Sequence, residues 1–177
     1  MSRVGLSKLA IPSSVKLEVQ DDQVKVTASG KTQTFPVPEG FIVKQEGGKV
    51  GVEPINKVNC NRAMWGTVTR NLFQVIQGLD KPFEKKVELK GVGYKAALQG
   101  KKLVLDLGYS HKVEYDLHED VSVKIEKPTE LLFSSVSKQK LGQTVSEIMK
   151  HRKPEPYKGK GIIPAGYFVL RKEGKKK

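Results

Sequence analysis

The fold of this chain follows from one stretch, Val15-Lys16-Leu17-Glu18-Val19-Gln20-Asp21-Asp22-Gln23-Val24-Lys25-Val26-Thr27-Ala28. Apolar and polar residues alternate in it on both sides of Asp21-Asp22, and a period of two residues is the pattern of a strand with one buried face. Two adjacent aspartates are typical of a turn. The stretch therefore predicts an antiparallel β-hairpin.

The alternating pattern continues after this hairpin but is absent before it. Residues 32–35 predict a third strand, and residues 41–43 and 50–52 predict two more on either side of the turn Gly47-Gly48, a typical hairpin connection. Residues 3–12, in contrast, form a short lead-in with too little apolar content to fold alone. The sequence thus predicts five strands before residue 54.

A helix should follow, because the apolar residues change to a spacing of three and four. Asn59 or Asn61 can cap its start, and Gly78 or Pro82 can end it. The apolar residues of this predicted helical face are Trp65, Val68, Leu72, Val75, Ile76 and Leu79. A helix with one apolar face is expected to cover one face of an antiparallel sheet.

The second half of the chain repeats this order. Alternating residues predict strands around positions 94–98, 103–107, 113–117, 121–125 and 131–133, followed by a helical stripe over residues 141–149. At offsets of 76–80 residues, Val24 aligns with Leu103, Phe35 with Tyr115 and Leu72 with Ile148. We therefore predict an α+β fold of two tandem copies, each a small antiparallel β-sheet packed against one α-helix. The expected domains are residues 1–82 and 83–177.

Positive charge gathers at the end of the chain. The net charge is +13, yet residues 83–137 contain nine basic and nine acidic side chains, whereas residues 138–177 contain twelve basic and three acidic ones. Such a concentration predicts attraction to nucleic acid, to an anionic membrane surface or to an acidic protein.

Within this region, one motif is typical of a chain that binds a polyanion: Arg152-Lys153-Pro154-Glu155-Pro156-Tyr157-Lys158-Gly159-Lys160-Gly161-Ile162. The two prolines stop the preceding helix and stiffen the backbone. The glycines allow close approach of the main chain, the lysines reach phosphates, and the tyrosine ring can stack on a base. At the start of the second helix, where free N–H groups favour phosphate, the sequence adds Lys138, Gln139, Lys140 and Gln143.

Other candidate sites are weak. Gly91-Val92-Gly93-Tyr94-Lys95-Ala96 fits a dinucleotide fingerprint in letters only, because a strand and not a helix should follow it; a bulge or a close approach of strands explains these glycines better. The histidines at 111, 118 and 151 lack partners at metal-ligand spacing and are expected in solvated turns. We therefore predict no enzyme, no cofactor, no metal and no small-molecule substrate.

Cys60 is the single cysteine, so no internal disulfide can form and a reducing compartment is expected. The start of the chain lacks a secretion signal, and no apolar run reaches the length of a membrane span. A cytoplasmic location is the default expectation, with an organellar one left open.

Several motifs of the chain resemble those of one family, the bacterial-type ribosomal protein six of the large subunit. They are Met1-Ser2-Arg3-Val4-Gly5, Arg62-Ala63-Met64-Trp65-Gly66-Thr67, Gly91 to Ala96, Gly108-Tyr109-Ser110-His111, Lys138 to Gln143, and Arg152 to Ile162. Residues 162–167 depart from the usual ending of the family.

The resemblance implies a structural protein of the ribosome that binds 23S rRNA, beside the sarcin–ricin loop and the base of the stalk, where translation factors dock. It also implies neighbouring large-subunit proteins as partners and main rRNA contacts in the second copy. The expected RNA-binding residues are Lys138, Gln139, Lys140, Gln143, Arg152, Lys153, Tyr157, Lys158, Gly159, Lys160, Gly161, Arg171 and Lys172. Deletion of residues 152–177 is expected to abolish rRNA binding while the first copy stays folded.

Two alternatives remain open on the residues alone. A peripheral binder of anionic membranes would need bulky apolar residues opposite the cations of the second helix, where the apolar stripe is narrow and should face its sheet. A general DNA-binding protein would share the charge pattern. Competition by duplex DNA against folded rRNA would distinguish DNA binding from rRNA binding.

Overall fold

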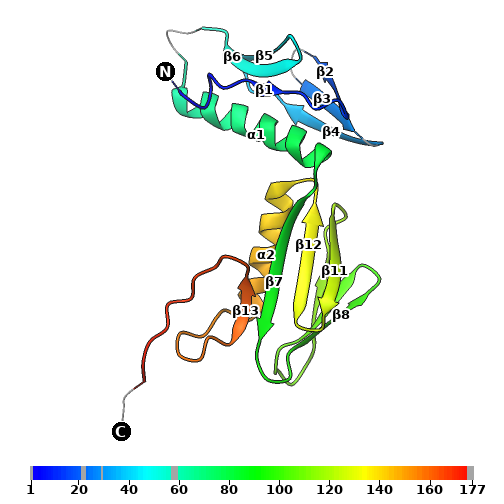
Figure 1. Ribbon diagram of the computed structural model, residues 1–177, viewed down its shortest axis with the longest axis vertical. Coiled ribbons are helices and arrows are strands. Elements are labelled where there is room, and N and C mark those ends of the chain that lie inside the picture. The colour runs from blue at the N-terminus through cyan, green and yellow to red at the C-terminus, as the bar shows by residue number, and fades with distance from the viewer. Residues whose placement is uncertain (1, 21–22, 29, 57–59, 175–177) are drawn as a thin grey trace. The chain divides into compact units, whose positions relative to one another are not determined.

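The computed structural model describes residues 2–20, 23–28, 30–56 and 60–174. The chain divides into two compact units, Met1–Pro82 and Phe83–Lys177. Within the described residues, each unit contains two antiparallel sheets and one long helix, in the order six strands and then a helix, and the second unit adds a final strand (Figure 1). The α+β prediction is confirmed, and the sheet of each copy is divided into two.

In the first unit, one sheet has the order β2-β3-β4 and the other has the order β1-β6-β5. The predicted hairpin lies in the first of these sheets, with Val24 opposite Val19 and Val26 opposite Leu17; its turn, Asp21-Asp22, lies outside the described residues. The bounds are β1 (Leu9–Ala10), β2 (Val15–Val19), β3 (Gln23–Ala28), β4 (Lys31–Pro36), β5 (Phe41–Glu46) and β6 (Lys49–Pro54).

Helix α1 (Arg62–Asp80) packs on both of these sheets. The Asn61 side chain caps its start by accepting bonds from the N–H groups of Ala63 and Met64 at 3.2 and 3.3 Å; Asn59 lies outside the described residues. Gly78 does not end the helix but is buried inside it, and the chain leaves the helix at Lys81, directly before Pro82. A proline at that position disfavours a helical conformation in the residue before it.

The lead-in joins the fold of the first unit. Leu9–Ala10 pairs with β6, and Gly5 lies against the buried Trp65, so close that a Cβ on Gly5 would be 2.4 Å from the ring carbon Cδ2. The indole Nε1 donates a hydrogen bond of 2.7 Å to the carbonyl of Val52. These few residues therefore fold on the surface that the sheet and helix provide, although their own apolar content is small.

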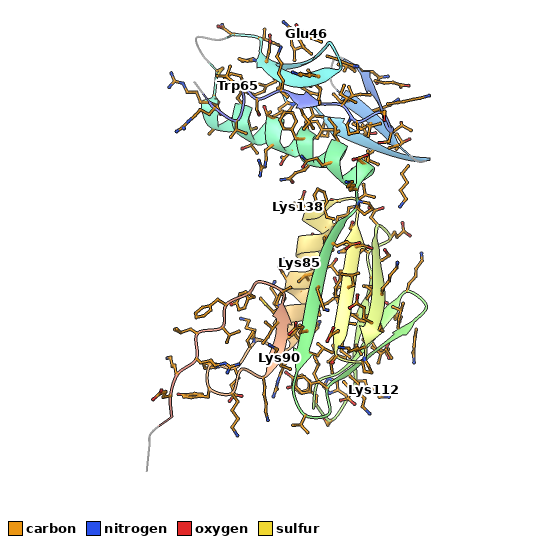
Figure 2. All side chains as sticks on the ribbon, in the orientation of Figure 1. Glu46, Trp65, Lys85, Lys90, Lys112 and Lys138 are labelled. Atoms are coloured by element: carbon orange, nitrogen blue, oxygen red, sulfur yellow. The ribbon has the colours of Figure 1, made fainter. Side chains whose placement is uncertain are left out.

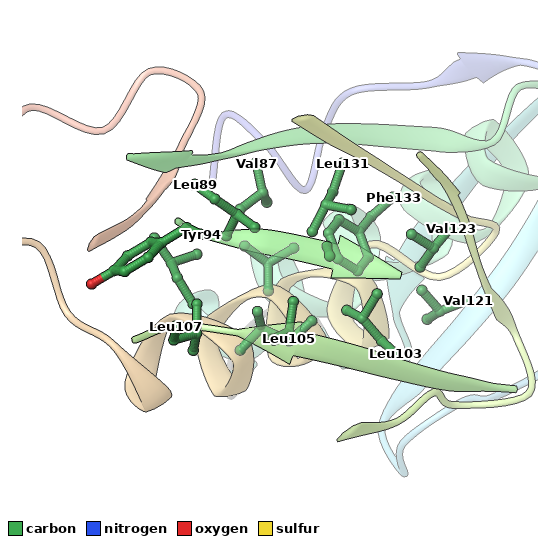
Figure 3. Packing of buried hydrophobic residues seen from close by; sticks show 14 of the residues in the cluster. Val87, Leu89, Tyr94, Leu103, Leu105, Leu107, Val121, Val123, Leu131 and Phe133 are labelled. Carbon is green, nitrogen blue, oxygen red and sulfur yellow. The ribbon is translucent and has the colours of Figure 1, made fainter. Parts of the chain in front are cut away.

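The second unit has a four-stranded sheet of order β11-β12-β7-β13 and a three-stranded sheet of order β10-β9-β8. Side chains of the two sheets meet in one core around Phe133, Leu103 and Leu105 (Figure 3). The bounds are β7 (Phe83–Lys90), β8 (Lys95–Gln99), β9 (Lys102–Asp106), β10 (Val113–Asp116), β11 (Val121–Lys127), β12 (Glu130–Ser135) and β13 (Gly161–Pro164).

Helix α2 (Lys138–His151) packs on β12, β7 and β13. Its buried stripe of Leu141, Val145 and Ile148 belongs to the same core. This matches the stripe that the sequence predicts. At 1.5 Å per residue, the helix separates its two ends by roughly 20 Å, and the segment after it returns to the sheet as β13.

Strands β7 and β13 were not predicted. Strand β7 lies between β12 and β13, and Leu89 pairs with Ile162, whose side chain is fully buried. Residues 161–164 are therefore part of the sheet and not of a tail. Deletion of residues 152–177 would remove this strand and damage the core, so it cannot separate RNA binding from folding.

In the Gly91–Ala96 segment, residues 91–94 form the turn between β7 and β8, and Lys95 begins β8. No helix begins there, so the dinucleotide interpretation is wrong. A Cβ on Gly91 would be 2.6 Å from the Tyr94 ring, which is a close approach and not a bulge. His111 and His118 are exposed outside strands and helices, as expected, whereas His151 is the last residue of α2.

Candidate nucleic-acid interface

The segment between α2 and β13 is a folded loop, and residues 152–160 are called the basic loop below. The N–H of Ile162 donates to the carbonyl of Arg152 at 3.0 Å, and the N–H of Glu155 donates to the carbonyl of Lys160 at 2.7 Å. A third bond of 3.1 Å runs from the N–H of Gly159 to the carbonyl of Glu155. The loop is thus an irregular hairpin with Lys158 near its tip.

Both glycines of this motif have a reason inside the protein. Gly161 has a φ of 140°, and a Cβ there would lie 2.7 Å from the carbonyl oxygen of Lys153. Gly159 has a φ of 68° and is buried under the guanidinium group of Arg171, whose Nε would be 3.2 Å from a Cβ. Only glycine meets both demands without strain. The glycines shape the loop, whereas the sequence had indicated close approach to a partner.

The cations of the basic loop face solvent without a counter-charge from the protein. Lys153, Lys158 and Lys160 are exposed, and none forms an ion pair within the described residues. Some cations of the sheets are compensated instead. Lys86, for example, lies 2.8 Å from Glu130 and 3.3 Å from Glu126, and hydrogen bonds to Glu130 and Glu126 raise the pKa of Lys86. Within the described part of the chain, the cations of the basic loop are therefore uncompensated, as are Lys95 and Lys124 on the strands, whereas Lys86 is paired.

Arg152, the residue directly after α2, is held by two tyrosines. Its Nε donates to the hydroxyl of Tyr94 at 3.2 Å, and its guanidinium carbon lies 5.0 Å from the centre of the Tyr109 ring. The Tyr109 hydroxyl donates to the carbonyl of His151 at 2.9 Å. The side chain remains exposed. Arg152 therefore fixes the base of the loop while leaving part of its charge accessible.

The four predicted residues at the start of α2 lie at the other end of this helix, so the structure does not bring them together with the basic loop. Figure 2 shows Lys138 at one end of the helix and Lys90 near the opposite end of the sheet. Lys138 lies 5.9 Å from the centre of the Phe83 ring. Ser137 caps the helix, its Oγ accepting from the N–H of Lys140 at 3.4 Å.

Two of these four side chains already have partners in the protein. The ammonium group of Lys140 forms an ion pair with Asp120, and the Gln143 amide donates to Glu147 at 2.9 Å. Gln139 is exposed. The start of α2 is consequently a weaker candidate for phosphate contact than the basic loop, because part of its charge is compensated.

The last described residues lie beside the basic loop. The N–H of Lys172 donates to the carbonyl of Pro156 at 2.8 Å, and the Arg171 guanidinium covers Gly159. Tyr157 is 56% exposed. Residues 171 and 172 thus lie against the basic loop; the basic residues 175–177 lie outside the described residues.

Sequence reasoning missed exposed apolar residues on this surface. Tyr167, Phe168 and Leu170 expose 51%, 83% and 67% of their surface. The sequence does contain the aromatic pair Tyr167-Phe168 between Pro164 and Arg171. However, a run of apolar residues usually indicates a buried segment. Lys90, at the end of β7, also lies next to these residues.

Other kinds of site find no support in the described part of the chain. It contains no group of three His, Cys, Asp or Glu side chains that could hold a metal ion. None of its helices has both the length and the apolar character needed to cross a membrane.

The fold and this surface define a two-unit α+β protein with a cationic, solvent-facing end. The family model of Ribosomal protein L6 matches residues 90–163. Over 177 residues and the whole of both chains, the protein is 44% identical to the large ribosomal subunit protein uL6 of Methylorubrum extorquens and 46% identical to that of Rhodopseudomonas palustris. The uL6 protein of Methylobacterium nodulans is 42% identical over the same length.

The chain therefore belongs to the ribosomal protein L6 family. It is a structural protein of the large ribosomal subunit and not an enzyme. The relatives are bacterial, so its location is the cytoplasm, where bacterial ribosomes work. The resemblance seen in the sequence is confirmed.

Proposed function

We propose that the protein binds 23S rRNA with one surface of its second unit. The surface consists of the basic loop together with Arg171 and Lys172. The observation that carries the proposal is the set of exposed loop lysines without protein counter-charges, since cations of this kind neutralise phosphates and position a protein on RNA.

The individual residues take different roles in this proposal. Lys153, Lys158 and Lys160 contact phosphates, Tyr157 stacks on a base, and Gly159 and Gly161 hold the shape of the loop. Arg152 both fixes the loop and offers its remaining donors. Lys138, Gln139, Lys140 and Gln143 form a second and weaker contact at the far end of α2.

The place of this contact in the subunit is also a proposal. The binding region is the 23S rRNA next to the sarcin–ricin loop and the base of the stalk, with other large-subunit proteins as neighbours. There the protein would support the region where translation factors dock. The family resemblance and the basic second unit support this placement.

Footprinting of the full chain on 23S rRNA tests the proposal. Protection beside the sarcin–ricin loop is expected, and it should need a higher protein concentration in the variant Lys158→Gln/Lys160→Gln. If about six to ten cations contact phosphates, affinity should fall by roughly 10³ to 10⁵ between 50 and 200 mM salt. Affinity that is constant over this range, or equal competition by duplex DNA, would refute specific rRNA binding through phosphates.

A further inference from the structure

Residues 165–172 form an anchored segment that we call the C-terminal strap. At its start, the N–H of Ala165 donates to the carbonyl of Lys86 at 2.8 Å. At its end, the N–H of Lys172 donates to the carbonyl of Pro156, also at 2.8 Å. Figure 1 shows the strap leaving β13 and passing beside the basic loop. The strap is thus fixed to the second unit at both ends.

Between these anchors the strap presents apolar side chains to solvent. Phe168 is 83% exposed and Tyr167 is 51% exposed. Tyr157 of the neighbouring basic loop is 56% exposed. The core of the unit does not use these rings, and exposed apolar surface on a held segment is typical of a binding site.

A shallow groove runs along the strap. It has a volume of about 460 Å³ and is lined by Lys90, Gly159, Ile163 and residues 167–171. Gly159 and Ile163 add apolar surface to its lining and Arg171 adds positive charge, whereas the Lys90 ammonium group lies 3.3 Å from the Glu88 carboxylate. The groove therefore combines flat apolar surface with cations.

The surrounding charge identifies the occupant. Residues 152–174 contain six cationic side chains and two acidic ones. None of the six forms an ion pair within the described part of the chain. A polyanion with flat apolar faces complements such a surface. In duplex RNA the bases are stacked on each other, so aromatic rings can stack only on unpaired ones.

We propose that the C-terminal strap binds an unpaired stretch of RNA, with bases stacked on Tyr167 and Phe168 and phosphates on Arg171 and Lys172. This rests on the proposed rRNA binding and adds to it a second mode of contact. The basic loop then binds phosphates of the folded RNA, while the strap binds unpaired nucleotides, whose bases are free to stack.

The test uses the full chain and three probes: 23S rRNA, a single-stranded RNA of about 16 nucleotides, which is an upper site size for single-strand binding folds, and the duplex of that RNA with its complement. Phe168→Leu removes the ring at an exposed position, and Phe168→Tyr keeps it. Val92→Ala, at an apolar residue that is 88% exposed outside the strap, is the matched control.

We expect Phe168→Leu to weaken binding of the single strand and of 23S rRNA by roughly 5- to 100-fold, the effect of losing one stacked base. Binding of the duplex, and the slope of log affinity against log salt, should not change. Phe168→Tyr and Val92→Ala should bind all three RNAs like the unmodified chain.

The failures are distinguishable. If the unmodified chain binds 23S rRNA but Phe168→Leu binds every probe equally well, the strap proposal is wrong and the proposed function stands. If the unmodified chain does not bind 23S rRNA, the proposed function itself is wrong. Unchanged RNA affinity of Phe168→Leu with poorer incorporation into reconstituted large subunits would assign the strap to a protein neighbour and overturn the proposal.

Discussion

The main-chain N–H of Ile162 donates a hydrogen bond of 3.0 Å to the carbonyl of Arg152. This bond joins the residue directly after α2 to a core residue of β13, and it closes the basic loop at its base. The position of the loop lysines is therefore set by the same elements that form the core of the second unit. RNA affinity and the stability of this unit should be linked through this loop.

The first prediction concerns Gly161. A Cβ at this residue would overlap the carbonyl oxygen of Lys153 at 2.7 Å, and its φ of 140° disfavours other residues. We expect Gly161→Ala to lower the free energy of unfolding by about 1–3 kcal/mol or more, measured by urea denaturation with circular dichroism. Gly166→Ala, with a φ of 81° and no atom within 4 Å, carries the backbone strain alone. If Gly161→Ala and Gly166→Ala lose the same free energy of unfolding, the overlap with the Lys153 carbonyl is not the cause of the loss.

The second prediction separates compensated from uncompensated lysines. Lys158→Gln and Lys160→Gln should each reduce the slope of log affinity for 23S rRNA against log salt by about 0.7–0.9, the contribution of one phosphate contact. Lys140→Gln should change the slope less, because Asp120 already neutralises this lysine. Filter binding at several salt concentrations measures all three slopes. Equal reductions would show that the ion pair opens when RNA binds.

The third prediction uses the contact between Tyr115 and Glu147. Burial and the hydrogen bond to Glu147 raise the pKa of Tyr115 to about 12. In the unfolded chain a tyrosine ionises near pH 10, so this contribution to stability is complete below about pH 10 and is lost as the pH rises towards 12. The difference in the free energy of unfolding between the protein and Tyr115→Phe should shrink across this window.

Urea denaturation in neutral buffer and in buffer above the ordinary tyrosine pKa measures that difference. Tyr157→Phe is the control, because Tyr157 is 56% exposed and should not affect stability in either buffer. A difference for Tyr115→Phe that stays constant over the whole range would show that its hydroxyl titrates alike in the folded and unfolded chains.

The fourth prediction concerns the first unit. Gly5→Ala should push the Trp65 ring away from its position, because the new Cβ would lie 2.4 Å from it. Overpacking of this kind costs about 1–3 kcal/mol. Trp65 is the single tryptophan of the chain, so urea denaturation followed by its fluorescence reports on this site directly.

Gly51→Ala provides the comparison for Gly5→Ala. Its new Cβ would meet only the Lys8 side chain, at an ordinary 3.4 Å. The urea concentration at the midpoint of unfolding should therefore stay the same or rise in Gly51→Ala, since alanine is favoured over glycine inside a strand. A fall as large as that of Gly5→Ala would mean that the Trp65 contact is not the cause.

Most of the local structure was predictable, because alternation and helical spacing mark elements whose one face is buried. Strand β7 escaped for a physical reason. Its sequence, Phe83-Glu84-Lys85-Lys86-Val87-Glu88-Leu89-Lys90, is dominated by charges, and long charged side chains can lie in a sheet with their ends in solvent. Strand β13 contains glycine and proline, which are typical of loops, and it is fixed by pairing with β7, far away in the sequence.

The candidate site was predicted in its composition more than in its arrangement. The clustering of cations in residues 152–172 was visible in the sequence, and the structure places Arg171 and Lys172 beside the basic loop. The roles of Gly159 and Gly161 were not visible in the sequence. Glycine is required both for a close approach inside the protein and for a close approach to a partner. Nor could spacing reveal that Asp120, eighteen residues before α2 begins, reaches Lys140.

The pairing of β13 with β7 sets an order of events during synthesis. Strand β7 leaves the ribosome long before residues 161–164 do, so one of its edges stays unpaired until those residues have also been made. The first unit has all of its strands by residue 54 and its helix by residue 80, and it can mature while translation continues. The unit with the densest positive charge is thus completed after the first unit, which can already be folded by then.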